Sequence, residues 1–103
     1  MSGGADSLET TRSRYASHDL LGPLVESYIQ GLPTALGALE QAVRAGEDRQ
    51  ILRLSHRLSG DAATYGFAAL ADLAREVELA KPQDRRDAMR QLKDLSRRIC
   101  RSL

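Results

Sequence analysis

The histidine in the stretch RLSHRLSGDAATYG (residues 53–66) combines a residue type and a set of neighbours that suit chemistry. On a helix, His56 lies about 140° from the centre of the apolar face, so its imidazole should face solvent. Arg49 and Arg53 precede it on the same side. A neutral imidazole nitrogen is a nucleophile that can form a covalent intermediate. Nearby guanidinium groups would disfavour protonation of the ring but would stabilise a phosphate carried on it.

Small residues follow His56 on the same helix face. Gly60 lies one turn further along the helix and Ala63 lies two turns further. A glycine inside a helix costs about 1 kcal/mol relative to alanine, which favours a role in the close approach of another molecule. No His or Cys lies three or four residues from His56, so we expect no metal site there. From residue type and exposure alone, an incidental surface histidine is an equally good interpretation.

The composition bounds the class of protein. The chain has 103 residues, which suggests one domain with one core. Only 4% of the residues are aromatic and none is Trp, so the core should consist mostly of Leu and Ala, which favours helices. The net charge of +1 gives no overall attraction to nucleic acid or membrane. Cys100 is the one cysteine, so no internal disulfide can form, and we expect a cytoplasmic protein in a reducing compartment.

Four amphipathic segments predict an all-α fold, an antiparallel up-down four-helix bundle with a short N-terminal helix or arm. The first segment continues in phase across Pro33, which predicts one kinked helix, and Gly46 is the expected C-terminal cap. We expect helices over about 24–43, 47–66, 67–80 and 84–103. A flexible arm over 1–16 should precede a bundle over 17–103, with a short helical turn at 17–21 and Pro23 in a first helical turn.

The same periodicity predicts which residues face the core. In the first segment these are Leu24, Val25, Tyr28, Ile29, Leu32, Ala35, Leu36, Leu39, Ala42 and Val43. In the second they are Ile51, Leu54, Ser55, Leu58 and Ala62. In the third and fourth they are Leu70, Leu73, Ala74, Val77, Met89, Leu92, Leu95, Ile99 and Leu103.

The stretch SHRLSGDAATYGFAALADLAREVE resembles the histidine phosphotransfer (HPt) domains of bacterial phosphorelays. The family pattern is H-x-L-K-G, then small residues, a glycine and a Leu-rich helix that ends in L-E or V-E. It is matched here by His56, Leu58, Gly60, Gly66, Leu70, Leu73 and Glu78. The upstream residues, including Pro33 and Gly46, are similar to the family's second helix and turn, and the resemblance covers about residues 19–98.

This resemblance implies a function. His56 would accept a phosphoryl group from the aspartate of one receiver domain and pass it to another receiver. It also implies a phosphocarrier without autokinase activity that needs no metal or cofactor of its own, because the receiver supplies the acidic pocket and Mg²⁺. The implied partners are receiver domains of response regulators, a hybrid histidine kinase, or both. We expect a monomer that binds neither nucleic acid nor a membrane.

One position departs from the family pattern. Ser59 stands where the family usually has a lysine, three residues after the histidine, and that lysine is thought to help hold the phosphoryl group. Arg53 and Arg57 are the candidate substitutes. The helical wheel favours Arg53, because it lies closer to His56. Asp61 is also unusual at a position that is commonly small and uncharged.

Two functions remain open at this point. Exposed His56 beside Gly60 favours a phosphocarrier, whereas Ser59 favours a degenerate HPt fold that binds a receiver or kinase without carrying phosphate. The residues expected to act in phosphotransfer are His56, Arg53, Arg57, Ser59 and Gly60. Those expected to contact a partner are Arg49, Leu52, Arg53, Gly60 and Ala63.

The last segment carries a separate basic stripe. From Lys81 onward there are eight Lys and Arg residues against three Asp residues. The stripe, on the side opposite the apolar face, consists of Arg86, Arg90, Lys93, Arg97 and Arg101. Such a stripe is usually a solvated face. The alternative is docking to an acidic partner, an anionic lipid or nucleic acid, and the absence of interleaved aromatic residues argues against nucleic acid.

Overall fold

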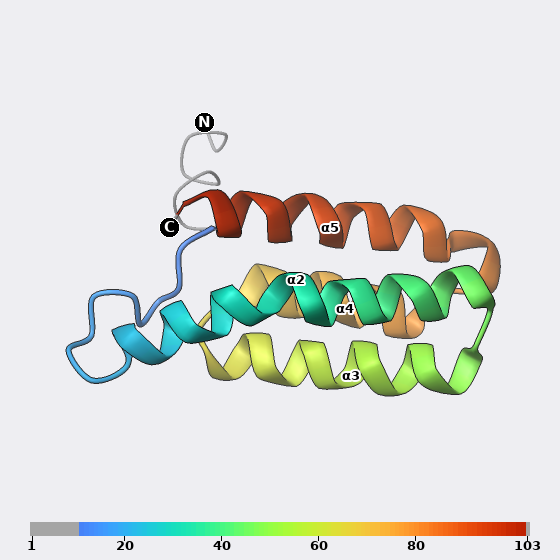
Figure 1. Ribbon diagram of the computed structural model, residues 1–103. Helices are drawn as coiled ribbons and strands as arrows, with labels where there is room; N and C mark the ends of the chain where they lie inside the picture. The colour runs from blue at the N-terminus through green and yellow to red at the C-terminus, as the bar shows by residue number, and fades with distance from the viewer. Residues whose placement is uncertain (1–10, 103) are drawn as a thin grey trace.

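The fold consists of helices joined by short turns. The computed structural model describes residues 11–102. It contains α2 (Gly22–Ala45), α3 (Asp48–Thr64), α4 (Ala68–Leu79), the short 3₁₀ helix η1 (Pro82–Asp84) and α5 (Arg85–Arg101). Within the described range no strand occurs, and no helix is long and apolar enough to cross a membrane. In Figure 1 the chain reverses direction at each turn between consecutive long helices.

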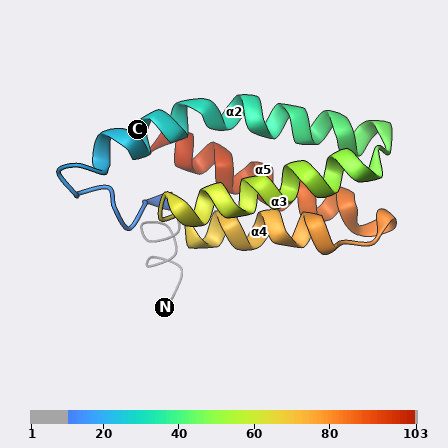
Figure 2. The same cartoon turned by 90° about the horizontal axis from the view of Figure 1, so that it is seen from below.

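The four long helices pack in a ring. Helix α3 packs against α4, α4 against α5, and α2 against both α3 and α5. The α3–α4 pair therefore lies on the opposite side of the bundle from the α2–α5 pair. Figures 1 and 2 show this arrangement from two directions.

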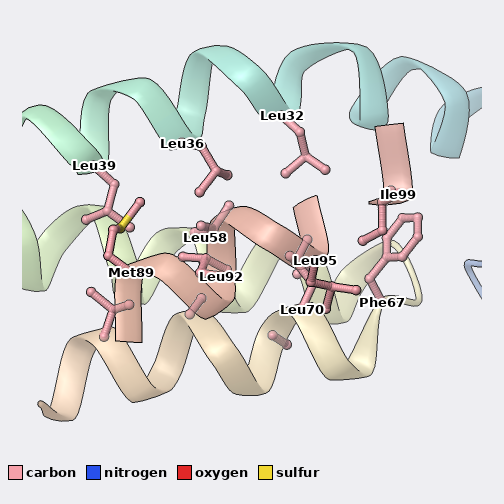
Figure 3. Packing of buried hydrophobic residues seen from close by; sticks show 14 of the residues in the cluster. Leu32, Leu36, Leu39, Leu58, Phe67, Leu70, Met89, Leu92, Leu95 and Ile99 are labelled. Carbon is pink, nitrogen blue, oxygen red and sulfur yellow. The ribbon is translucent and has the colours of Figure 1, made fainter. Parts of the chain in front are cut away.

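Leucine and alanine side chains fill most of the space between the helices, as the composition predicts (Figure 3). Phe67 is the one aromatic residue in the fully buried set. Burial of each leucine contributes about 2 kcal/mol of hydrophobic stabilisation. The buried hydrophobic residues are Val25, Ile29, Leu32, Leu36, Leu39, Ala42, Ile51, Leu58, Ala62, Phe67, Leu70, Ala71, Ala74, Val77, Ala88, Met89, Leu92, Leu95 and Ile99.

The predicted core is wrong at two positions in α2. Leu24 is 53% exposed although Val25 next to it is buried, because Leu24 lies at the edge of the apolar face of α2. Ala35 is also exposed, on the side of α2 that borders α3. Leu54 and Leu73 are only partly buried. Leu103 lies outside the described residues.

Helix α2 is one continuous helix through Pro33, as predicted. Proline has no N–H, so the carbonyl of Ile29 lacks its usual helical donor. The Sγ atom of Cys100 on α5 lies 3.9 Å from that oxygen and provides a weak replacement. Gly46 ends the helix as expected, with a left-handed φ of 67°.

The segment before α2 contains the expected helical turn. The Gly22 N–H donates to the His18 carbonyl at 2.8 Å, and α2 begins at Gly22 with Pro23 in its first turn. His18 Nδ1 accepts hydrogen bonds from the backbone N–H groups of Leu20 and Leu21, at 3.1 and 3.2 Å. This side-chain acceptor satisfies N–H groups that have no carbonyl partner at the start of the turn. Of the expected arm over 1–16, residues 1–10 lie outside the described range, and its boundary stays a prediction.

The turn between α3 and α4 is covered by the chain that precedes α2. The Arg14 N–H donates to the Gly66 carbonyl at 3.1 Å, and buried Ser13 donates its hydroxyl to the Tyr65 carbonyl. Gly66 has a φ of 84°. A Cβ atom there would lie 2.6 Å from Ser13 Oγ and 2.9 Å from Tyr15 Cδ2. Both the backbone conformation and the close approach of this segment therefore require glycine.

Gly66→Ala is expected to lower the free energy of unfolding by about 1–3 kcal/mol, because it adds left-handed strain and a clash with the covering segment. Gly60→Ala is the matched control, since a Cβ at Gly60 meets no atom within 4 Å. This control should raise the free energy of unfolding by up to about 1 kcal/mol. Urea denaturation of the two variants measures both changes. Equal losses of stability would contradict the assigned role of Gly66.

Candidate functional site

His56 lies on the solvent-facing side of α3. Its side chain is 78% exposed, which confirms the exposure expected from the helical wheel. The opposite side of α3 is buried and contains Ile51, Ser55, Leu58 and Ala62. Burial of this apolar face fixes the rotation of α3 about its axis, and so holds the imidazole at the surface.

A carboxylate from the neighbouring helix holds one nitrogen of the imidazole. His56 Nδ1 lies 3.0 Å from Glu78 Oε2 on α4. An ionised carboxylate can only accept a hydrogen bond, so Nδ1 must carry the hydrogen. The neutral ring then has its lone pair on Nε2, the nitrogen farther from the backbone. The pair thus orients the ring and keeps the outer nitrogen available as a nucleophile.

Glu78 matches a family pattern in the sequence, but its contact with His56 could not be predicted from that pattern. Glu78 is 22 residues from His56, and its side chain is only 23% exposed. Their contact depends on how far α4 is shifted along α3. A helical wheel describes one helix and contains no information about that shift.

Ser59, expected at the site, points its hydroxyl toward α4. Its Oγ donates to the Ala71 carbonyl at 3.0 Å, and the residue is only partly exposed. The hydroxyl is therefore already used in holding α3 against α4. A neutral hydroxyl in this position supplies no positive charge for an anion on His56.

The two candidate arginines have different partners. Arg53 Nε donates to the neutral Gln50 side chain at 2.9 Å. Arg57 Nε lies 3.9 Å from Asp61 Oδ2, so an acidic group compensates part of its charge. Among the described residues, no hydrogen bond joins either guanidinium group to His56. Arg53 retains the less compensated positive charge of the two.

Arg57 and Asp61 line a hollow between α2 and α3, on the side of α3 away from α4. Tyr28 also lines it, and its ring stacks on Tyr65 with centroids 4.6 Å apart. Burial raises the pKa of the Tyr28 phenol well above its usual value, and the nearby charge of Asp61 raises it further. Tyr28 is therefore a neutral group at neutral pH. The structure thus places Arg57 beside this hollow, on the side of α3 away from Glu78 of α4.

The surface around His56 is open. A Cβ at Gly60 would meet no atom within 4 Å, and Arg49, Arg53 and Ala63 are exposed. Leu52, one turn before His56, is 46% exposed. The structure adds Leu79, which follows Glu78 and is 71% exposed. Leu79 could not be predicted as a neighbour of His56 from helical periodicity, because it lies at the end of α4 and not on the helix that carries His56.

Comparison with known protein families gives one match. A model of the Hpt domain matches residues 23–101, a span that includes nearly all of α2 and reaches the end of α5. The chain belongs to the Hpt domain family. No curated protein and no solved structure matches it. The Hpt domain implies histidine phosphotransfer in phosphorelays, and it implies interaction with receiver domains or kinases of two-component systems.

The role of Glu78 in this Hpt domain can be tested by nitrogen NMR. In the wild type, neutral His56 is expected to carry its hydrogen mainly on Nδ1. Glu78→Ala removes the acceptor and should shift the population toward the form with hydrogen on Nε2. Glu76→Ala is the matched control, because Glu76 is an exposed acid on α4 with no contact to His56. The nitrogen-15 shifts of the ring report the tautomer, and an unchanged ratio in Glu78→Ala would contradict the assigned role.

Proposed function

We propose that this Hpt domain relays a phosphoryl group between receiver-domain aspartates through His56. The observation that carries the proposal is the exposed imidazole whose Nδ1 is held by Glu78, so that Nε2 faces solvent. Such a site has a positioned nucleophile and little else. That is sufficient for phosphoryl transfer, in which positioning and charge stabilisation provide most of the catalysis.

In the proposed step, His56 Nε2 attacks the phosphorus of a receiver's aspartyl phosphate. The new P–N bond forms as the P–O bond to the aspartate breaks, and the aspartate leaves as a carboxylate. The ring keeps its hydrogen on Nδ1 and gains positive charge. Glu78 stabilises that charge through the existing hydrogen bond. The reverse sequence delivers the phosphoryl group to a second receiver.

The receiver supplies the acidic pocket and Mg²⁺ in this proposal, and the Hpt domain contributes no metal or cofactor. The chain acts as a phosphocarrier without autokinase activity. Its partners are receiver domains of response regulators, a hybrid histidine kinase, or both. We place the protein in the cytoplasm, as a monomer with an antiparallel bundle.

The proposed docking surface surrounds His56 on α3 and α4. Leu52 and Leu79 provide exposed apolar area on one side of the imidazole. Gly60 and Ala63 leave the other side flat, so that a receiver can bring its phosphorylated aspartate close to Nε2. The remaining proposed contacts are made by Arg49 and Arg53.

A degenerate Hpt domain that binds a receiver or kinase without carrying phosphate is the second candidate. Ser59 favours it, because the residue at the usual lysine position uses its hydroxyl to hold the Ala71 carbonyl. A wild-type chain that binds a receiver measurably but takes no phosphate from any phosphorylated receiver would establish this second function.

His56→Gln is expected to abolish phosphoryl transfer. The wild type, incubated with a phosphorylated receiver, should acquire label that is labile in acid and stable in base. His18→Gln is the matched control, because it removes the other histidine and should keep the label. Label that persists in His56→Gln would exclude His56 as the phosphorylated residue.

Arg53→Ala is expected to slow transfer more than Arg57→Ala. Arg53 has the less compensated charge, and its guanidinium can pair with a phosphate on His56 through two hydrogen bonds. Rapid-quench measurement of the transfer rate tests this, with circular dichroism to verify that both variants fold. Equal, near-wild-type rates would show that neither arginine replaces the lysine.

Gly60→Gln should leave the fold intact and slow transfer, because the added side chain projects from the flat surface beside His56. Gly37→Gln is the control. Gly37 lies inside α2, and a Cβ there also meets no atom within 4 Å. It lies on the side of α2 that borders α5, away from His56. The phosphoryl transfer rates of the two variants are compared. A wild-type rate in Gly60→Gln would mean that no partner approaches at Gly60.

A further inference from the structure

A concave surface lies between α2 and α5. These two helices lie on the opposite side of the bundle from α3 and α4, which carry His56 and Glu78 (Figures 1 and 2). The concave surface consists of two adjoining hollows of about 390 and 400 Å³, called here the α2–α5 groove. Both hollows are lined by Glu40 of α2 and by Lys93 and Arg97 of α5. A molecule bound here would leave the surface around His56 free.

The α2–α5 groove carries much of the positive charge of the chain. The basic residues that line it are Arg44, Arg86, Arg90, Lys93, Arg97 and Arg101, and the acidic ones are Glu40 and Asp94. The whole chain has 15 Lys and Arg against 14 Asp and Glu, so the rest of the chain has nine basic and twelve acidic residues. The groove is therefore a positive surface on a nearly neutral protein, and it attracts acidic groups.

The structure already holds one carboxylate in the α2–α5 groove. Lys93 Nζ donates to Glu40 Oε2, and Arg44 Nη2 lies 3.4 Å from the same oxygen. The hydrogen bond from Lys93 lowers the pKa of Glu40, so this acid is ionised at neutral pH. Arg86 and Arg101 have no ion-pair partner among residues 11–102. These two cations remain available to carboxylates of another molecule.

The spacing of the cations on α5 fits a second helix. From Arg86 to Arg101 they follow one another every three or four residues, which extends over about 22 Å, or four helical turns. A helix lying along the groove would present acidic residues at the same intervals. The floor of the second hollow has small or apolar side chains, from Pro33, Leu36, Gly37, Ser96 and Cys100. It can accept an apolar side chain of that helix.

We propose that the α2–α5 groove docks an acidic amphipathic helix of a partner protein. This inference is independent of phosphoryl transfer at His56. A protein helix fits better than single-stranded nucleic acid, because no aromatic side chain lines the groove for base stacking and the small or apolar lining of the second hollow can accept an apolar side chain of a helix. It also fits better than a lipid surface, since a concave lining matches a rod and not a plane.

The test uses the nitrogen-15-labelled full chain and a capped helical peptide with glutamates along one face and leucines along the other. The peptide should shift the backbone amide signals of α2 and α5 and leave those around His56 unchanged. Arg97→Glu should weaken binding by about tenfold at low salt. A version of the peptide with every Glu replaced by Gln should bind the wild-type chain no more tightly than the original peptide binds Arg97→Glu.

Arg98→Glu is the matched control. It lies next to Arg97 on α5 and makes the same change of charge, but it does not line the groove. Its affinity for the peptide should stay close to that of the wild type. The proposal is overturned if the peptide does not bind, if it shifts the signals around His56 instead, or if Arg97→Glu and Arg98→Glu weaken it equally. Tighter binding of phosphatidylserine vesicles or of a DNA oligonucleotide than of the peptide would overturn it as well.

Discussion

The hydrogen bond between His56 Nδ1 and Glu78 Oε2 is the contact on which this account of the protein depends. It converts an exposed surface histidine into an oriented ring with one available nitrogen. The bond joins two helices, so it exists only if α3 and α4 pack in one register. The turn that follows α3 helps to set that register, because Gly66 adopts a left-handed conformation and the segment around Ser13 binds over it. The Ser59 bond to the Ala71 carbonyl fixes the same pair of helices further along.

The proposed phosphotransfer site and the main positive surface lie on opposite sides of the bundle. His56 lies at the α3–α4 side, where its exposed neighbours include the apolar or small Leu52, Gly60 and Ala63 and the basic Arg49 and Arg53. The cations of α5 border the α2–α5 groove on the other side. The two surfaces share no helix. This arrangement allows a partner to bind at each side at the same time.

Much of this architecture could be predicted from the sequence, because it depends on periodicity within single helices. The exposure of His56 followed from the apolar face of α3, and the end of α2 followed from Gly46. Contacts between helices could not be predicted in this way. Glu78 and the Ser59–Ala71 bond depend on the shift of α4 along α3. Leu24 was misplaced because periodicity does not show which residues at the edge of an apolar face are covered by a neighbouring helix.

The basic stripe on α5 illustrates the same limit. The sequence placed these cations opposite the apolar face, as on a solvated surface, but several of them border a groove beside α2. Glu40 on α2 contacts Lys93 on α5, a pairing across 53 residues of chain. Whether a charged stripe is a plain surface or the wall of a groove depends on the neighbouring helix, which the pattern of one segment does not specify.

The position of phosphorus on the imidazole shows whether Nε2 of His56 is the nucleophile. After transfer from a phosphorylated receiver, phosphorus–nitrogen correlation NMR of the labelled chain identifies the bonded nitrogen. We expect phosphorus on Nε2 of His56, with the hydrogen retained on Nδ1 beside Glu78. Phosphorus on Nδ1, or on any other residue, would contradict it.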